Sequence, residues 1–82
     1  MFYVYIIQSE IKNWKYIGVT EDVQHRLSLH NSGATKSTKP HRSLRLIYSE
    51  SFPNKTSALK RELFLKKNYK AREEIYKKLG II

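Results

Sequence analysis

The sequence predicts a small α/β domain of the α+β type, in which a three-stranded antiparallel sheet is covered by helices in the order ββαβαα. Two observations carry this prediction. Three segments of strand length have either the aromatic and β-branched composition or the alternation of strands, and they are bounded by polar or turn-forming residues. Three other segments have the apolar spacing and the capping residues typical of helices. With 82 residues there is room for one core, so residues 1–82 are expected to form a single domain.

The first two strands are expected at the N-terminus. Residues 2–8 are apolar on both faces, as in a central strand. Residues 14–19 (Trp-Lys-Tyr-Ile-Gly-Val) form the second strand, and the short polar link between the two segments suggests a hairpin. Because the first apolar stretch turns polar at Gln8, it is too short for a signal peptide or a membrane span.

The first helix is expected directly after the second strand. Thr20 is the predicted N-cap, with Glu21 and Asp22 in the first turn, where the helix dipole favours negative charge. The helix should continue to about Asn31 and end at the Ser-Gly pair that follows.

The second half of the chain supplies the remaining three elements. Residues 34–43 show no periodicity and are expected to form a loop, whereas residues 44–51 alternate as a third strand. A turn at Pro53-Asn54 precedes the longest helix, from Lys55 to about Asn68. A short final helix is expected over Ala71–Leu79, before a glycine that ends it.

The charge is strongly basic and unevenly distributed. Sixteen Lys and Arg residues against seven Asp and Glu residues give a net charge of +9, which favours anionic partners. No acidic residue occurs between Asp22 and Glu50. No basic amphipathic helix coincides with this stretch, so a membrane partner is not expected. The residues of the stretch expected to bind nucleic acid are Lys36, Lys39, Arg42 and Arg45.

Two polar side chains of the first predicted helix fall on its inward side. At about 100° per residue, Arg26 and His30 lie in the arc between Val23, Leu27 and Leu29. Either residue alone is more often a snorkelling arginine or a hydrogen-bonded core histidine. The pair on one inward arc indicates a site, because a buried guanidinium needs an anionic partner or a cleft.

The second predicted helix has a similar feature. Its buried face is expected to consist of Ala58, Leu59 and Leu65, and Glu62 falls near the middle of that arc. An inward carboxylate on a basic protein is a candidate ligand for a hard divalent cation such as Mg²⁺. The alternative is an ordinary intrahelical ion pair, since the surrounding residues include Lys60, Arg61, Lys66 and Lys67.

Tyrosines and a glycine mark the two N-terminal strands. Tyr3, Tyr5 and Tyr16 fit simple strand preference, since a buried phenol needs only one partner. Gly18 follows Tyr16 on the same strand face. Because glycine weakens a strand, it suggests the close approach of a ligand or of another backbone segment.

An ordered set of these residues resembles the signature of the GIY-YIG nuclease family. The set consists of Tyr3-Val4-Tyr5, Tyr16-Ile17-Gly18, Arg26, His30 and Glu62. The resemblance extends over nearly the whole chain and is closest to small single-domain bacterial members related to the N-terminal nuclease domain of excision-repair endonucleases. Tyr3 and Val4 replace the glycine and isoleucine of the family name, so only Tyr5 of that triplet would be functional.

The resemblance implies hydrolysis of phosphodiester bonds in nucleic acid, with DNA as the expected polymer and one divalent ion, Mg²⁺ or Mn²⁺, as cofactor. It implies that Glu62 binds the metal and that Arg26 stabilises the charge on the phosphorane. We favour Tyr16 as the residue that activates the water, with Tyr5 hydrogen-bonded nearby and His30 taking or relaying the proton. The division of roles between the tyrosines stays open at this point.

Two other functions also stay open. A non-catalytic nucleic-acid-binding module would keep the fold and the basic face, and its binding would weaken steeply with salt without requiring metal. A small protein-interaction domain is the third alternative, although no motif specifically supports it. The absence of cysteine excludes disulfides and thiolate metal sites, and it is consistent with a reducing cytoplasm.

Overall fold

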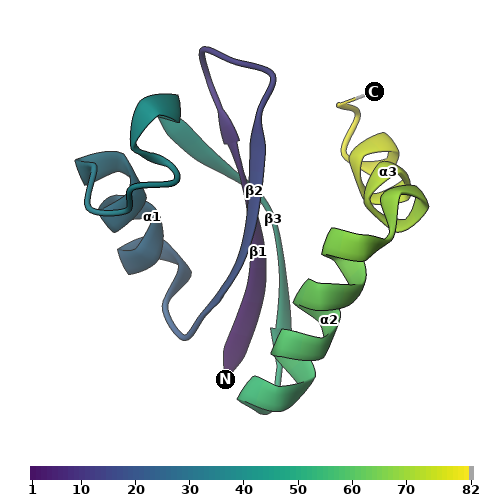
Figure 1. Cartoon of the computed structure of the whole chain (residues 1–82). Coiled ribbons are helices and arrows are strands. Elements are labelled where there is room, and N and C mark those ends of the chain that lie inside the picture. The colour runs from purple at the N-terminus through teal and green to yellow at the C-terminus, as the bar shows by residue number, and fades with distance from the viewer. Residues whose placement is uncertain (82) are drawn as a thin grey trace.

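The computed structural model describes residues 1–81 and contains one antiparallel sheet (Figure 1). Its strands are β1 (Phe2–Ser9), β2 (Lys15–Thr20) and β3 (Leu44–Phe52), and their order is β2-β1-β3. The central position of β1 and its hairpin with β2 are confirmed. The continuous apolar run of β1 is explained by this position, because both faces of the strand are covered.

Helices cover both faces of the sheet. Helix α1 (Val23–Ser32) lies on one face, and α2 (Lys55–Lys67) and α3 (Tyr69–Lys78) lie on the other (Figure 1). The predicted order ββαβαα is confirmed, and the expected loop contains a short 3₁₀ helix, η1 (Lys39–His41), that was not predicted. No helix within residues 1–81 has the length and apolar character needed to cross a membrane.

The start of α1 differs from the prediction. Thr20 is still paired with Tyr3 in the β-ladder, so it cannot cap the helix. Asp22 is the N-cap instead, with extended backbone angles and an Oδ1 atom that accepts a hydrogen bond from His25 N at 3.0 Å. Glu21 therefore precedes the helix, and the acidic charge of Asp22 acts from the cap position rather than from the first turn.

Asn68 separates α2 from α3. Its backbone is extended, which ends α2, and its side-chain oxygen accepts from Ala71 N at 3.2 Å, which caps α3. The last helix consequently begins at Tyr69, two residues earlier than predicted. The same arrangement occurs at the start of α2, where Asn54 accepts from Ser57 N at 2.8 Å.

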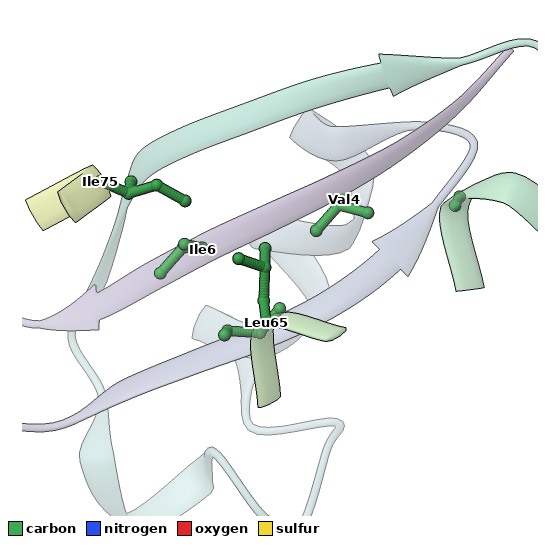
Figure 2. Close-up of a cluster of buried hydrophobic side chains, with 6 residues drawn as sticks. Val4, Ile6, Leu65 and Ile75 are labelled. Carbon is green, nitrogen blue, oxygen red and sulfur yellow. The ribbon is translucent and has the colours of Figure 1, made fainter. Parts of the chain in front are cut away.

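The core has two parts, one on each face of the sheet. The part beneath α2 and α3 includes Val4, Ile6, Leu65 and Ile75 (Figure 2). Burying each such aliphatic side chain contributes about 1.5–3 kcal/mol. The part beneath α1 is built on Tyr5, Ile7 and Leu44. Because successive residues of β1 point to opposite faces, Tyr5 is directed toward α1 and away from the aliphatic core of the other face.

A register shift in the pairing of β1 with β3 modifies the predicted alternation of the third strand. Ile6 pairs with Tyr48 and Ile7 pairs with Leu46, which leaves Ile47 as an extra residue. As a result, Tyr48 packs against the core beneath α2 and α3, whereas Leu46 packs against the core beneath α1.

Candidate active site

A pocket of about 400 Å³ lies where residues of β1, β2, α1 and α2 meet. Tyr5 comes from β1, and Tyr16 and Gly18 come from β2. Arg26 comes from α1 and Glu62 from α2. Four of the five side chains predicted to be catalytic therefore line one cavity, although they belong to four different elements. In one cavity a guanidinium can bind a phosphate while a carboxylate binds a cation.

His30, the fifth of these residues, lies behind the pocket. Its side chain is fully buried on the inward side of α1. His30 Nε2 is 2.8 Å from Tyr5 Oη, and His30 Nδ1 is 2.8 Å from the Oγ1 atom of Thr38, which is equally buried. The imidazole is therefore connected to the pocket through the Tyr5 hydroxyl.

The directions of these hydrogen bonds follow from the available acceptors. Thr38 Oγ1 donates to the carbonyl oxygen of Thr35 at 3.3 Å, because a carbonyl can only accept. The Thr38 oxygen then accepts from His30 Nδ1–H, and His30 Nε2 accepts from the Tyr5 hydroxyl. Burial, together with the nearby Arg26 charge, lowers the pKa of His30, so the ring is neutral at pH 7.

The Tyr5 phenol responds to the charges of the pocket. Burial raises the pKa of Tyr5, and the Tyr16 and Glu62 side chains act in the same direction. The Arg26 guanidinium lowers the pKa and partly offsets these effects. The phenol is therefore protonated at neutral pH and donates to His30, and additional positive charge in the pocket would favour its ionisation.

Gly18 provides the space that the Tyr5 ring occupies. The two residues are paired across the β1–β2 ladder. A Cβ atom on Gly18 would lie 2.6 Å from Tyr5 Oη, which is too close for any real contact. The close approach predicted from this glycine is thus made by the Tyr5 side chain, rather than by a ligand or a second backbone segment.

Tyr16 lies beside the same group of rings. Its ring is in edge contact with the His30 ring, with centroids 5.1 Å apart, and it is 6.4 Å from the Tyr5 ring. The hydrogen bond at His30 Nε2 is to Tyr5, whereas Tyr16 contributes to the pocket wall.

Glu62 is half-buried and makes the intrahelical ion pair that was one interpretation from the sequence, whereas its role as a metal ligand stays a prediction. Its carboxylate lines the pocket, and its Oε2 atom is 3.4 Å from Lys66 Nζ one helical turn away. The prediction for Leu59 was wrong, since its side chain is 42% exposed. Ala58 and Leu65 form the buried stripe of α2, and Leu59, about 100° away from Ala58, turns toward the pocket.

Three residues that belong to this site were not predicted from the sequence. Glu21 and Lys55 line the pocket, and Thr38 holds His30 from behind. The helical spacing of Lys55, Leu59 and Glu62, which puts them on one face of α2, could have indicated Lys55. No local pattern marks Thr38, because its importance depends on a contact with a residue eight positions earlier.

The residues predicted to bind nucleic acid lie outside the pocket. Lys36, Lys39 and Arg42 are exposed on the segment between α1 and β3. Arg45 is exposed on β3, at the opposite edge of the sheet from β2. Their role in binding nucleic acid stays a prediction.

The segment that carries these cations is held in place by contacts with the site's surroundings. The His41 ring stacks on Trp14 with centroids 3.8 Å apart and planes 4° apart. Lys12 Nζ donates to the Pro40 carbonyl oxygen at 3.0 Å. Thr38 belongs to the same segment, so the basic segment and His30 share a direct hydrogen bond.

The donors in the pocket suit a hard divalent cation that keeps part of its water shell. Glu62 and Glu21 supply carboxylate oxygens, and residues 1–81 contain no cluster of three or more His, Cys, Asp or Glu side chains that could hold a metal ion by themselves. Mg²⁺ is usually bound by one or two carboxylates, with waters and substrate phosphate oxygens completing the octahedron. The residues present therefore fit such an ion.

Comparison with known proteins identifies the family. The model of the GIY-YIG catalytic domain matches residues 1–77. The chain belongs to the GIY-YIG family. The tripeptides that resemble those of the family name are residues 3–5 on β1 and 16–18 on β2, and in the antiparallel hairpin they meet at the Tyr5–Gly18 pair. Membership of this family implies a nuclease-type function and a nucleic acid substrate.

Several relatives of this GIY-YIG domain are of similar size. UPF0213 protein YazA of Bacillus subtilis is 35% identical over 90% of this chain and 75% of its own. UPF0213 protein VNG_2274C of Halobacterium salinarum is 36% identical over 90% of this chain and 96% of its own. The solution NMR structure of UPF0213 protein BH0048 from Bacillus halodurans matches with a TM-score of 0.56 and 32% identity, covering 96% of this chain and 85% of that one.

Proposed function

We propose that this GIY-YIG domain is a divalent-metal-dependent endonuclease that hydrolyses phosphodiester bonds, with DNA as its polymer. One observation carries the proposal. Tyr5, Tyr16, Arg26 and Glu62 line a single pocket, and His30 accepts a hydrogen bond from the Tyr5 hydroxyl at 2.8 Å. A nucleophile activator, a guanidinium and a carboxylate in one cavity form the set that phosphodiester hydrolysis requires.

The cations of the pocket bind the scissile phosphate. Arg26 offers several N–H donors in a planar array that matches the arrangement of phosphate oxygens. Its hydrogen bonds to these oxygens become stronger as negative charge accumulates in the transition state. Lys55, at the first position of α2, supplies a second positive charge from the opposite wall. Together they orient the phosphate in the pocket and offset its charge.

Glu62 would be the main ligand for Mg²⁺ or Mn²⁺, and Glu21 would supply a second carboxylate in the same pocket. A cation bound there would polarise the scissile phosphate and stabilise the leaving oxygen. Without the cation, Glu62 Oε2 is in a weak ion pair with Lys66 Nζ, 3.4 Å away and one helical turn along α2.

The geometry supports Tyr5, rather than Tyr16, as the residue that takes the proton from water. Its hydroxyl already donates to His30 Nε2, so its own proton can pass to that neutral imidazole as it accepts one from the water. The resulting imidazolium donates through Nδ1–H to Thr38. Tyr16, on the wall of the same pocket, positions the water.

Cleavage assays with a matched carboxylate control test the proposal. Branched, flapped and single-stranded DNA, and RNA, are incubated with Mg²⁺ or Mn²⁺ and with wild type, Glu62→Gln or Glu74→Gln protein. Glu74 is exposed on α3, outside the pocket, so its substitution removes the same charge. We expect Glu74→Gln to cut like wild type and Glu62→Gln to be at least about 100-fold slower.

Two results would overturn the proposal. Equal cleavage by Glu62→Gln and wild type would remove Glu62 from the reaction. Salt-sensitive binding without cleavage of any substrate by wild type would instead assign the domain to the class of non-catalytic nucleic-acid-binding modules.

A further inference from the structure

A second pocket, of about 370 Å³, adjoins the first and has a different character. The two pockets share Tyr16, which forms part of the wall of each. The second lies between β2 and the helices α2 and α3, and its other lining residues are Lys15, Ile17, Lys66, Arg72 and Tyr76. It lies outside the basic segment between α1 and β3, whose cations are predicted to bind nucleic acid.

The side chains that line this pocket are positively charged, and ion pairs neutralise little of that charge. It contains three cations, Lys15, Lys66 and Arg72, and no acidic residue. Within residues 1–81, Lys66 is the only one of the three in an ion pair, and its partner is Glu62 at 3.4 Å. An ion pair between partly exposed residues one helical turn apart is weak, so an incoming anion can compete for Lys66.

Two of the three cations are held in place before any ligand binds. Arg72 Nη1 donates to the carbonyl oxygens of Leu65 and Lys66 at 2.6 and 2.8 Å, at the end of α2. The other N–H groups of its guanidinium remain available as donors. Lys15 Nζ lies 4.8 Å from the centroid of the Tyr76 ring. Groups that are already ordered lose less conformational entropy on binding, which favours a site over a mobile charged surface.

The two pockets are close enough for one nucleic acid strand to contact both. Glu62 in the first pocket and Lys66 in the second are four residues apart on α2, about 6 Å along the helix axis, and their charged atoms are 3.4 Å apart in the ion pair. One strand of a duplex advances about 3.4 Å per nucleotide. A strand with its scissile phosphate beside Glu62 would therefore place a phosphate one or two nucleotides away beside Lys66.

We infer that the second pocket is a phosphate subsite, which binds the backbone phosphate one or two nucleotides from the scissile bond on the same strand. This inference rests on the proposed function for the identity of the strand. Lys15, Lys66 and Arg72 bind the phosphate oxygens, and the shared Tyr16 separates the subsite from the reacting group. The subsite fixes the register of the strand relative to Glu62.

The first experiment compares two double variants of equal net charge. Lys15→Gln/Lys66→Gln removes two cations from the pocket, whereas Lys60→Gln/Lys70→Gln removes two exposed lysines of α2 and α3 that line neither pocket. Arg72 is left intact because it caps α2. Binding of labelled single-stranded DNA is measured by fluorescence anisotropy over a range of salt concentrations in EDTA, so that no cleavage occurs.

We expect the pocket variant to bind about tenfold more weakly at ~0.1 M salt, with a salt slope smaller by about 0.7, as for the loss of one phosphate contact. The control variant should change the affinity less than threefold. Equal losses of affinity for DNA in the two variants would overturn the inference, since the lysines would then act only through the net charge of the protein.

The second experiment locates the phosphate and separates a strand subsite from a site for free phosphate. Single phosphates of the oligonucleotide are replaced in turn by uncharged methylphosphonate. Replacement of one phosphate near the cleavage point should weaken the binding of the oligonucleotide to wild type but not to the Lys15→Gln/Lys66→Gln variant. The reason is that the replacement and the double substitution remove the same contact. Additive losses at every position, or displacement of the oligonucleotide by millimolar inorganic phosphate alone, would overturn the inference.

These outcomes are distinguishable from failure of the proposed function. Glu62→Gln removes cleavage without removing the subsite. If wild type does not cleave any substrate but the non-additive position is found, the subsite stands and the endonuclease proposal fails.

Discussion

His30 occupies the core because both of its ring nitrogens have partners. A buried imidazole with an unpaired nitrogen would be costly, and Tyr5 and Thr38 remove that cost with two 2.8 Å hydrogen bonds. The same two bonds determine which nitrogen carries the proton. In the proposed mechanism Thr38 is therefore a positioning residue, which acts through His30 rather than on the substrate.

Replacing Thr38 tests this role. Thr38→Val keeps the shape of the side chain but removes the acceptor for His30 Nδ1–H, so we expect a loss of about 1–3 kcal/mol in the free energy of unfolding. Cleavage should slow about 10- to 100-fold, since Tyr5 loses a correctly oriented proton acceptor. Urea denaturation and ¹⁵N NMR of the imidazole measure stability and tautomer.

Thr38→Ser is the matched variant and should restore both the tautomer and most of the activity. An unchanged His30 tautomer in Thr38→Val would show that Thr38 has no orienting role, whatever the change in rate.

At the level of the elements, short connections position the side chains that are predicted to be catalytic. The β1–β2 hairpin brings Tyr5 opposite Gly18, and Asp22 starts α1 immediately after β2, which directs Arg26 and His30 toward the sheet. On the other face, α2 carries Glu62 to the same edge of the sheet. Asn68 then ends α2 and starts α3, which brings Arg72 into the lining of the second pocket.

The cap at Asn68 gives a prediction at this scale. Asn68→Ala removes the acceptor for Ala71 N and should lower the free energy of unfolding by about 1 kcal/mol. Because Asn68 lines neither pocket, the cleavage rate at a temperature well below the melting point should be unchanged. Thermal unfolding and a cleavage assay measure the two effects, and Asn68→Asp should retain the stability. A large loss of activity at full stability would indicate a role in the reaction instead.

At the level of the whole molecule, the buried histidine links global stability to pH. The pKa of His30 is lower in the folded state than in the unfolded chain, so the unfolded chain binds more protons as the pH falls below about 6.5. This contribution to stability is complete above the unfolded pKa and is lost as the pH falls from about 6.5 toward the folded-state pKa. The slope of the free energy of unfolding against pH that results from His30 can reach about 1.4 kcal/mol per pH unit.

Urea denaturation between pH 7.5 and 5.5 measures this effect. We expect the free energy of unfolding to decrease toward pH 5.5 in wild type and in His25→Gln, whose replaced side chain is exposed. The decrease should be smaller in His30→Gln, because among the histidines of residues 1–81 only His41 then has a lowered pKa. An equal slope in wild type and His30→Gln would contradict the assignment, and an NMR titration of His30 would check it directly should that variant not fold.

Most of the architecture was predictable from the sequence because it depends on neighbouring residues. Alternation, helical spacing and Gly, Pro and Asn positions predict strands, helices and their ends to within a few residues, and an ordered motif indicated four of the side chains that line the pocket. The errors in the elements themselves lie at their boundaries, such as Thr20 and the start of α3, where a residue can satisfy either of two adjacent elements.

Other features became visible only in three dimensions. Local periodicity assigns a side chain to a face of its own element, but it does not specify which atom of another element lies opposite. The bond of His30 to Tyr5 spans 25 residues, the exposure of Leu59 depends on where α2 crosses the sheet, and the second pocket combines β2, α2 and α3. Strand and helix periods are properties of consecutive residues, whereas hydrogen bonds and pockets arise from the packing of distant segments.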